Sequence, residues 1–419
     1  MEQKHIPERV ILTGVHTGCS DTLSDTNEES ISELEELVNT AGGEVIGILI
    51  QNKSDIETST YLGSGKLEEL KQLVISMQAD MVVFDNELSP IQLKNVSDYL
   101  DIKVLDRSML ILDIFAVRAK SGEGKLQVEL AQLKYTLPRL RGLGTTMSRT
   151  GAGIGTRGPG ETRLETDRRH ISRRIKALED ELKEIQKHRD LIRSRRKKDG
   201  VIIAALVGYT NAGKSTLLNC LTDADVFAEN KLFATLDTTS RAITLPDKRQ
   251  ILLIDTVGFI RKLPHHLIEA FKSTLEEAVV ADLLLHVIDS SSETLDEQVE
   301  VTKDVLSSIG AANKPIIGVY NKYDICEDSV IFKYYDTNVY ISAKNKTGID
   351  SLIDAISDNA PGKKRQYSML IPYCDGNILN IIHQQKVISE TYTNEGTELE
   401  VLLDNENYNK YKKYIKEVK

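Results

Sequence analysis

Short apolar runs alternate with amphipathic stretches over the first 120 residues of the chain. Four runs rich in β-branched residues predict strands over residues 10–15, 45–50, 81–84 and 102–105. Between them, apolar residues recur at helical spacing and predict helices over residues 31–40, 66–77 and 90–100. Strands that alternate with helices in this way are typical of βαβ units around a mostly parallel sheet. We therefore expect residues 1–120 to form a small N-terminal α/β domain.

Two amphipathic helical stripes follow this domain. Apolar residues at positions 126, 130, 133 and 137 predict a helix over residues 126–140, which we expect to end near Pro138 and Gly142. A second, highly charged stripe has apolar residues at positions 171, 175, 178, 182 and 185. Because two short stripes can bury each other side by side, we expect residues 121–199 to form an antiparallel helical hairpin. Residues 142–160 are then its tip loop, and RSRRKKDG (residues 193–200) is expected to be an exposed linker.

The rest of the sequence is again of α/β type. Apolar strands after residue 200 end in short polar motifs, which predicts a doubly wound domain over residues 200–362 with its ligands at the carboxyl ends of the strands. Residues 363–419 are expected to form a small C-terminal α/β domain. The 419 residues of the chain are enough for several such cores.

Charge is unevenly distributed between these segments. The formal net charge is −10, but residues 139–198 hold 18 Lys or Arg against 8 Asp or Glu, so this segment carries +10 and the remainder −20. Most charge runs are solvated helix faces. Segregation by sign instead favours contact with a polyanion, and we expect the hairpin to bind RNA.

The sequence indicates neither export nor a membrane span. The longest apolar stretches, such as residues 201–207, are far shorter than the roughly 20 residues of a membrane-spanning helix, and the N-terminus has no apolar signal-peptide core. The four cysteines are far apart and form no CxxC pair, which argues against a disulfide framework and a zinc site. We expect a soluble, cytoplasmic protein that acts as a monomer.

A phosphate-binding motif follows the first of the later strands. VIIAALVGYTNAGKSTLLNCL joins a predicted strand to a predicted helix through GxxxxGKS. The glycines let N–H groups surround a β-phosphate, Lys214 reaches the β- and γ-phosphates, and the Ser215 hydroxyl binds Mg²⁺. The predicted phosphate-loop residues are Gly208, Tyr209, Thr210, Asn211, Ala212, Gly213, Lys214 and Ser215. YLGSGKLEEL (residues 61–70) is not a second phosphate loop, because Thr60 stands where the first glycine is required.

Two further segments are expected to contact the γ-phosphate and the metal. QILLIDTVGF is an apolar strand that ends at Asp255, a carboxylate for the Mg²⁺ shell, and Gly258 then offers its N–H to the γ-phosphate. KLFATLDTTSR is a Thr-rich loop of the kind that orders around a γ-phosphate and Mg²⁺, and spacing alone leaves Thr235, Thr238 and Thr239 open as the second hydroxyl ligand. The predicted nucleotide-binding residues here are Phe233, Ala234, Thr235, Leu236, Asp237, Asp255, Thr256, Val257 and Gly258.

Guanine is the predicted base. In KPIIGVYNKYD, an apolar strand is followed by Asn321, Lys322, Tyr323 and Asp324. The Asp324 carboxylate can accept hydrogen bonds from both N1–H and N2–H₂ of guanine, whereas adenine would leave it buried and unpaired. After the next strand, a backbone N–H is expected to face the guanine oxygen from Ser342, Ala343 and Lys344. Four motifs in this order, each at a strand end, predict a GTPase.

Phe259 follows Gly258, where many GTPases of this fold carry a glutamine that orients the attacking water. A phenyl ring cannot orient water, so we expect slow intrinsic hydrolysis that a partner accelerates by arranging the loops around Lys214 and Mg²⁺. The alternative is that Phe259 only packs and that the base lies elsewhere. His265 and His266 have no third ligand nearby in the sequence, so no metal site is expected there.

Longer stretches of the chain resemble the HflX family of ribosome-associated GTPases. The resemblance is carried by residues 106–140, GIGTRGPGETRLETDRR (residues 153–169), GYTNAGKSTLLN and LFATLDTTSRAITLP, and it covers about residues 6–360. It implies that Thr235 is the second Mg²⁺ ligand, which completes a predicted catalytic set of Lys214, Thr235 and Gly258. The chain departs from the family in LDTTSR, where LDPTTR is more usual, and in Arg163, where members usually have Gln.

The resemblance also implies partners. The family binds the large ribosomal subunit and its rRNA and, in its GTP-bound form, dissociates stalled or idle ribosomes under stress. The alternative from another functional class is an RNA-binding or ribosome-assembly factor in which GTP and GDP only regulate residence time. An ATP-driven helicase is disfavoured by Asp324, although some family members also bind ATP.

GIGTRG, at residues 153–158, matches the GxGxxG pattern of dinucleotide-binding turns. A predicted helix precedes it instead of a strand, which excludes that interpretation. The glycines instead permit close approach of the backbone, and Arg149, Arg157 and Arg163 are predicted to contact RNA phosphates or bases. A flexible connector is the alternative.

Overall fold

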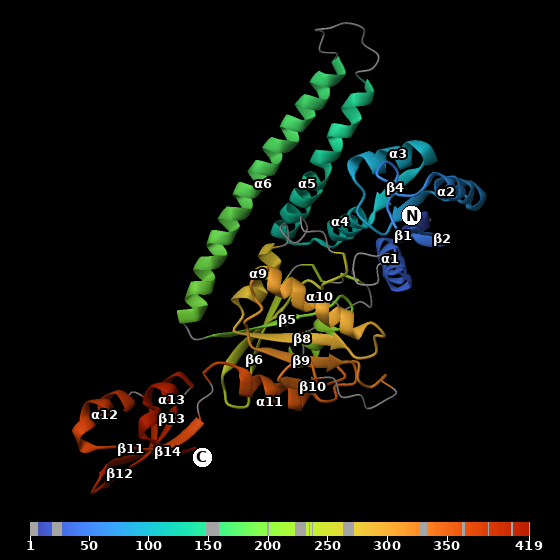
Figure 1. Cartoon of the computed structure of the whole chain (residues 1–419). Coiled ribbons are helices and arrows are strands. Elements are labelled where there is room, and N and C mark those ends of the chain that lie inside the picture. The colour runs from blue at the N-terminus through green and yellow to red at the C-terminus, as the bar shows by residue number, and fades with distance from the viewer. Residues whose placement is uncertain are drawn as a thin grey trace, which may run out of the picture.

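Three folded units and one long helical arm make up the protein (Figure 1). The computed structural model describes residues 7–18, 27–147, 159–198, 201–222, 232–233, 235–236, 238–262, 272–326, 333–362, 365–383, 385–403 and 405–418. The arm extends away from the central unit, beside the N-terminal unit, and the C-terminal unit lies at the opposite end of the molecule.

The N-terminal unit is a four-stranded parallel sheet between two pairs of helices. Its strand order is β2-β1-β3-β4, with β1 Arg9–His16, β2 Glu44–Asn52, β3 Met81–Phe84 and β4 Lys103–Asp106. The helices are α1 Glu28–Ala41, α2 Ser64–Met77, α3 Pro90–Leu100 and α4 Arg107–Arg118. Helices α1 and α4 pack on one face of the sheet and α2 and α3 on the other, so each face has its own hydrophobic core.

Side-chain caps begin three of these helices. Asn27 accepts a hydrogen bond from the backbone of α1, and Ser89 forms a capping box with Gln92 at α3. Asp106 caps α4 and also accepts a hydrogen bond from the Tyr135 hydroxyl of the arm, at 2.6 Å. The buried Asp106 therefore joins the N-terminal unit to the arm.

The arm is an antiparallel pair of helices, α5 Gly122–Met147 and α6 Pro159–Lys198. The prediction that the first helix ends near Pro138 and Gly142 is wrong, because α5 continues through Pro138. Packing against α6, with an Arg174–Glu129 ion pair at 2.6 Å, outweighs the local helix-breaking tendency of proline.

The expected linker at RSRRKKDG is also helical, since α6 runs to Lys198. Arg and Lys favour helix, and Arg193 is held by an ion pair with Glu277 at 2.7 Å.

The central unit, which we call the G domain, has a six-stranded sheet in the order β10-β9-β8-β5-β7-β6. Only β6 is antiparallel to its neighbour among the described strands, which are β5 Ile202–Val207, β6 Thr239–Thr244, β7 Gln250–Asp255, β8 Leu283–Asp289, β9 Ile316–Asn321 and β10 Thr337–Tyr340. The helices are α7 Lys214–Thr222, α9 Lys272–Val280, α10 Leu295–Ser308 and α11 Ile349–Asn359. Separate cores lie on the two faces of the sheet.

The C-terminal unit is a small antiparallel sheet with short helices on one face. The strand order is β12-β13-β11-β14, with β11 Arg365–Ile371, β12 Lys386–Thr393, β13 Gly396–Leu403 and β14 Ile415–Val418. The helices are α12 Gly376–Ile382 and α13 Asn405–Tyr411. Together, these units confirm the predicted α/β fold class with a doubly wound P-loop domain.

Candidate functional site

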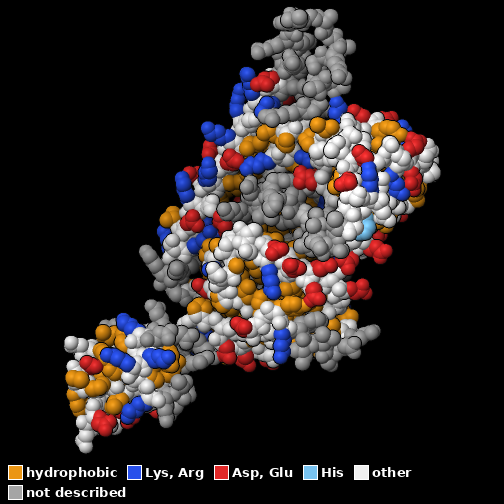
Figure 2. Space-filling view, viewed as in Figure 1, with side chains coloured by type: hydrophobic (Ala, Val, Ile, Leu, Met, Phe, Trp, Pro, Cys, Tyr) orange, Lys and Arg blue, Asp and Glu red, His pale blue; other side chains and the backbone are white. Residues whose placement is uncertain are grey.

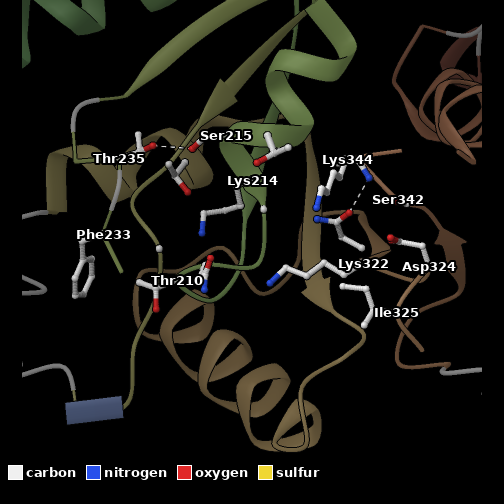
Figure 3. Close-up of a pocket in the computed structure, with 17 residues that line it drawn as sticks. Thr210, Lys214, Ser215, Phe233, Thr235, Lys322, Asp324, Ile325, Ser342 and Lys344 are labelled. Atoms are coloured by element: carbon white, nitrogen blue, oxygen red, sulfur yellow. Dashed lines mark hydrogen bonds between the residues drawn. The ribbon is translucent and has the colours of Figure 1, made fainter. Parts of the chain in front are cut away.

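A cavity of about 550 Å³ lies at the carboxyl ends of the G-domain strands (Figure 3). Ser215 and Thr235 lie at one end and Asp324, Ser342 and Lys344 at the other, with Lys214 between them. Sequence-distant motifs therefore meet in one site. The predicted residues that line it are Thr210, Asn211, Gly213, Lys214, Ser215, Phe233, Thr235, Thr256, Gly258, Asn321, Lys322, Asp324, Ser342, Ala343 and Lys344.

The P-loop, residues 208–215, wraps around the Lys214 side chain. Lys214 Nζ donates hydrogen bonds to the carbonyl oxygens of Gly208, at 3.1 Å, and Tyr209, at 2.7 Å. Gly208 has a φ of +142°, and a Cβ atom there would lie 2.2 Å from the Val287 carbonyl oxygen. Only glycine fits this position. Burial lowers the pKa of Lys214 to about 8, so the buried amine is still largely charged at neutral pH.

Three oxygen-bearing side chains converge at the start of α7. Ser215 Oγ lies 2.7 Å from Thr235 Oγ1 and 2.7 Å from Asp255 Oδ2. Asp255 Oδ1 is buried and has no hydrogen-bond partner among the described residues, and burial raises the pKa of this carboxyl group. An orphaned carboxylate oxygen beside two hydroxyl groups is a donor set that suits Mg²⁺. The structure thus brings Thr235 to Ser215, whereas Thr238 faces α6 beside Arg193 and Glu277.

The segment after Asp255 runs close to the P-loop. The Phe259 N–H donates to the Gly208 carbonyl at 3.1 Å, and the Thr210 N–H donates to the Phe259 carbonyl at 2.8 Å. These bonds place Gly258 beside Lys214 Nζ. The Phe259 ring is 1% exposed and packs with Leu275 in the core of the G domain, so it is not among the side chains that line the cavity.

The Asn321 side chain connects the base-binding motifs to the P-loop through two hydrogen bonds. Its Nδ2 donates to the Ala212 carbonyl at 2.8 Å, and its Oδ1 accepts from the Ala343 N–H at 3.0 Å. Asp324 Oδ2 accepts from Asn345 Nδ2 at 2.9 Å, which orients the carboxylate at the rim of the cavity. Each of these bonds joins a predicted motif residue to a different loop.

Some site residues were not predicted. Thr216 and Ile325 line the cavity, and Asp289 forms an ion pair with Lys322 at 2.7 Å. Thr216 and Ile325 directly follow predicted motif residues, and Asp289 ends a buried strand, so position at a strand end was the available signal.

Other predicted residues lie elsewhere. The side chains of Tyr209, Leu236 and Val257 are buried in a core shared with the N-terminal unit, and the Tyr323 ring packs on Tyr340. Ala234, Asp237, Arg149, Arg157, His265 and His266 lie outside the described residues, and the side chain of Arg163 in α6 is not described. Over the described part of the chain, no cluster of His, Cys, Asp and Glu could hold a metal ion, and no helix is long and apolar enough to cross a membrane.

Comparison with known proteins identifies the family. Family models match residues 28–116 (GTP-binding GTPase N-terminal), 118–196 (GTP-binding GTPase Middle Region) and 203–322 (50S ribosome-binding GTPase). The GTPase HflX of Caldanaerobacter subterraneus subsp. tengcongensis is 55% identical over 93% of this chain and 89% of its own length, and that of Lacrimispora saccharolytica is 50% identical over 94% and 93%. A GTP-binding protein from Sulfolobus solfataricus, crystallised with GDP, matches 84% of this chain and 98% of its own with 27% identity and a TM-score of 0.44.

Half or more of the residues are shared with the two HflX proteins over nearly the whole chain. The GTPase predicted from the four motifs is therefore confirmed as an enzyme that hydrolyses GTP, and the chain belongs to the HflX family of GTPases.

Proposed function

We propose that this GTPase binds the large ribosomal subunit in its GTP-bound form and separates stalled or idle ribosomes into subunits. The observation that carries this proposal is the arm. Exposed basic side chains follow the outer side of α6, and Figure 2 shows them along the edge of the molecule. They are Arg169, Arg173, Lys176, Lys183, Lys187 and Arg195.

A basic arm on an acidic protein suits a polyanion such as rRNA. The tip residues Arg149, Arg157 and Arg163 are proposed to reach the RNA first. The family model that matches the G domain is described as a 50S ribosome-binding GTPase, which supports the large subunit as the partner. We accordingly place the protein in the cytoplasm and propose that it acts as a monomer.

The cavity is proposed to bind GTP along its length. The Asp324 carboxylate recognises guanine, and the backbone at Ser342 and Ala343 faces its oxygen. Lys214 contacts the β- and γ-phosphates, and the Gly258 N–H donates to the γ-phosphate. After hydrolysis, this last contact is lost because GDP has no γ-phosphate.

Ser215 and Thr235 are proposed to hold Mg²⁺, and the orphaned oxygen of Asp255 supports the same site. When bound, Mg²⁺ neutralises negative charge on the β- and γ-phosphate oxygens. Ser215 lies at the start of α7, whereas Thr235 lies in the segment before β6, and their hydroxyl groups meet at one end of the cavity. They can act together only when the loop that carries Thr235 is closed.

We propose slow intrinsic hydrolysis because Phe259 stands where many GTPases of this fold carry a water-orienting glutamine. The Phe259 ring lies in the core of the G domain, so this position provides no group that orients water. We propose that the ribosome stimulates hydrolysis and that hydrolysis then releases the protein from the large subunit.

Sucrose gradients with purified ribosomes test the function. GTP and a non-hydrolysable analogue are expected to shift intact ribosomes to subunits in the presence of the protein, and GDP is not. A variant with residues 148–158 replaced by a short Gly-Ser linker should keep its GTP affinity and lose splitting. Ribosome binding without any shift to subunits would refute splitting and favour an RNA-binding or assembly factor.

A further inference from the structure

A threonine side chain lies in the wall of the cavity, at the third position of the P-loop. Thr210 is 6% exposed, and it lines the phosphate end of the cavity together with Lys214 and Gly258. Its hydroxyl oxygen is buried and has no hydrogen-bond partner among the described residues. Because a buried hydroxyl group without a partner is costly, such groups are uncommon in folded proteins. The Thr210 hydroxyl therefore indicates a partner that is bound in the cavity.

Backbone hydrogen bonds fix the position of Thr210. Its N–H donates to the Phe259 carbonyl at 2.8 Å, and the Phe259 N–H donates to the Gly208 carbonyl at 3.1 Å. The carbonyl of the preceding residue, Tyr209, accepts a hydrogen bond from Lys214 Nζ at 2.7 Å. Since the backbone is held in this way, the hydroxyl is redirected most readily by rotation about the Cα–Cβ bond of Thr210.

Thr210, Gly258 and Lys214 surround one point. A Cβ atom at Gly258 would lie 2.8 Å from both Cα and Cγ2 of Thr210 and 2.9 Å from Lys214 Nζ. In Figure 3, the Lys214 amine accordingly points towards Thr210. The Gly258 N–H and the Lys214 amine are the groups proposed to contact the γ-phosphate. The Thr210 side chain therefore lies next to the position proposed for the γ-phosphate.

The methyl group of Thr210, not its hydroxyl, faces this point in the structure, because Cγ2 is among the atoms nearest to Gly258 and Oγ1 is not. A rotation of about 120° around the Cα–Cβ bond brings the hydroxyl to the place of the methyl group. An oxygen atom can occupy that place because it is no larger than a methyl group. The rotated hydroxyl gains a charged acceptor when a γ-phosphate is bound, and hydrogen bonds to charged groups are stronger than those to neutral ones. A bound γ-phosphate therefore favours the rotated side chain.

We infer that the Thr210 hydroxyl donates a hydrogen bond to a γ-phosphate oxygen, and that Thr210 is thereby a residue that distinguishes GTP from GDP. GDP has no acceptor at this position, so the hydroxyl stays unpaired when GDP is bound. The contact holds the γ-phosphate beside Lys214, in a site where Phe259 provides no polar side chain. The inference rests on the proposed binding of GTP along the cavity, and it holds whether or not the ribosome is the partner.

Nucleotide affinities of full-length variants, measured without ribosomes, test the inference. Thr210→Val replaces the hydroxyl by a methyl group, and Thr210→Ser keeps the hydroxyl. Thr210→Val is expected to lower the affinity for a non-hydrolysable GTP analogue about tenfold, with GDP affinity kept within about twofold, whereas Thr210→Ser should keep both within about threefold. The matched control is Thr302→Val, because the Thr302 hydroxyl is also buried in the G domain but donates to the Gln298 carbonyl of α10 at 2.8 Å. This control should leave the ratio of the two affinities unchanged.

Thermal unfolding of the nucleotide-free protein separates this role from a structural one. Because the Thr210 hydroxyl is unpaired among the described residues, Thr210→Val is expected to keep or raise the Tm. Thr302→Val should lower the Tm, since it removes a hydroxyl that is hydrogen-bonded. A lower Tm for Thr210→Val, together with an equal loss of affinity for both nucleotides, would make Thr210 a structural residue.

An affinity ratio within about twofold of the wild type in Thr210→Val, or a loss that Thr210→Ser shares in full, overturns the inference. Asp324→Asn, measured in the same way, tests the nucleotide site itself. If Asp324→Asn lowers GTP affinity while Thr210→Val leaves the ratio unchanged, the cavity is the nucleotide site and only the role of Thr210 is refuted. If neither variant changes the binding of either nucleotide, the proposed site is refuted as well.

Discussion

Replacing Gly258 with alanine probes the proposed γ-phosphate contact, because the structure has no room for a methyl group there. A Cβ atom at Gly258 would lie 2.8 Å from both Cα and Cγ2 of Thr210 and 2.9 Å from Lys214 Nζ. Ordinary contacts of this kind are 3.4–4 Å, so the backbone must retreat by at least about 0.6 Å. Thr210 Cα cannot yield easily, since its backbone N–H is bonded to the Phe259 carbonyl at 2.8 Å.

Such a retreat weakens or removes the hydrogen bond from the residue 258 N–H to the γ-phosphate. A hydrogen bond to a charged group contributes about 1.5–3 kcal/mol, which corresponds to roughly a 10- to 150-fold change in affinity. We expect Gly258→Ala to lower the affinity for a non-hydrolysable GTP analogue by about this factor. GDP affinity should change less than about threefold, because the missing contact is to the γ-phosphate.

Equilibrium titration with fluorescent GTP analogue and GDP measures both affinities, and single-turnover hydrolysis shows whether the rate falls with them. Gly65→Ala is the matched control. A Cβ there has no neighbour within 4 Å, and the residue lies in the first turn of α2 in the N-terminal unit. An equal loss of affinity for both nucleotides, or no loss for either, would refute the proposed role of Gly258.

Three further predictions address the base, the metal and the arm. Asp324→Asn should lower GTP affinity at least about a hundredfold and raise affinity for xanthosine triphosphate, because the amide can donate to the xanthine 2-oxygen; competition binding measures both. Thr235→Ala should raise the Mg²⁺ concentration needed for single-turnover hydrolysis about tenfold, whereas Thr238→Ala, which faces α6, should not. Replacing Arg157 and Arg163 together by alanine should weaken ribosome binding and lower the slope of log K against log salt by about one to two. An unchanged slope would make the tip a connector.

Much of the fold follows from local pattern. The N-terminal helices were predicted because each buries one stripe, which leaves a period of 3.6 in the sequence. The strands were predicted because strands such as β1 and β3 are buried on both faces, which leaves short continuous apolar runs. The course of α5 through Pro138 could not be predicted in this way. It depends on α6, which lies side by side with it, and a proline rule based on neighbours in sequence does not include that packing.

The phosphate end of the site was predictable for a similar reason. Lys214 bonds to carbonyls only six and five positions away, so the motif contains its own partners. Motif spacing could not decide which of the three threonines lies beside Ser215, because this depends on the path of the chain in the folded protein. Thr239 begins β6 opposite Asp255, while Thr235 lies beside Ser215 at one end of the cavity.

No sequence motif predicts the contacts between the N-terminal unit and the G domain. Tyr209 and Glu33 are 176 positions apart, and Lys262 and Asp85 are 177 apart. Each partner viewed alone is an ordinary polar residue on a predicted helix or loop. Only the fold shows that these polar side chains, with the buried Asp85 among them, contact one another.

The arm contacts the G domain at α9, the described helix that comes after Gly258 in the chain. Near the end of α6, Gln186 Nε2 bonds to Glu276 at 2.9 Å, Arg193 pairs with Glu277 at 2.7 Å, and Arg189 pairs with Glu123 of α5 at 2.6 Å. Gln186 and Arg193 attach one end of a 40-residue helix, about 60 Å long, to α9, and the Arg189–Glu123 pair joins the two helices of the arm. A rigid helix held at one end transmits a displacement of its tip to that attachment. In the proposed function, a partner that binds the tip therefore acts on α9, the described helix that follows the Gly258 segment in the chain, without a contact of its own at the nucleotide.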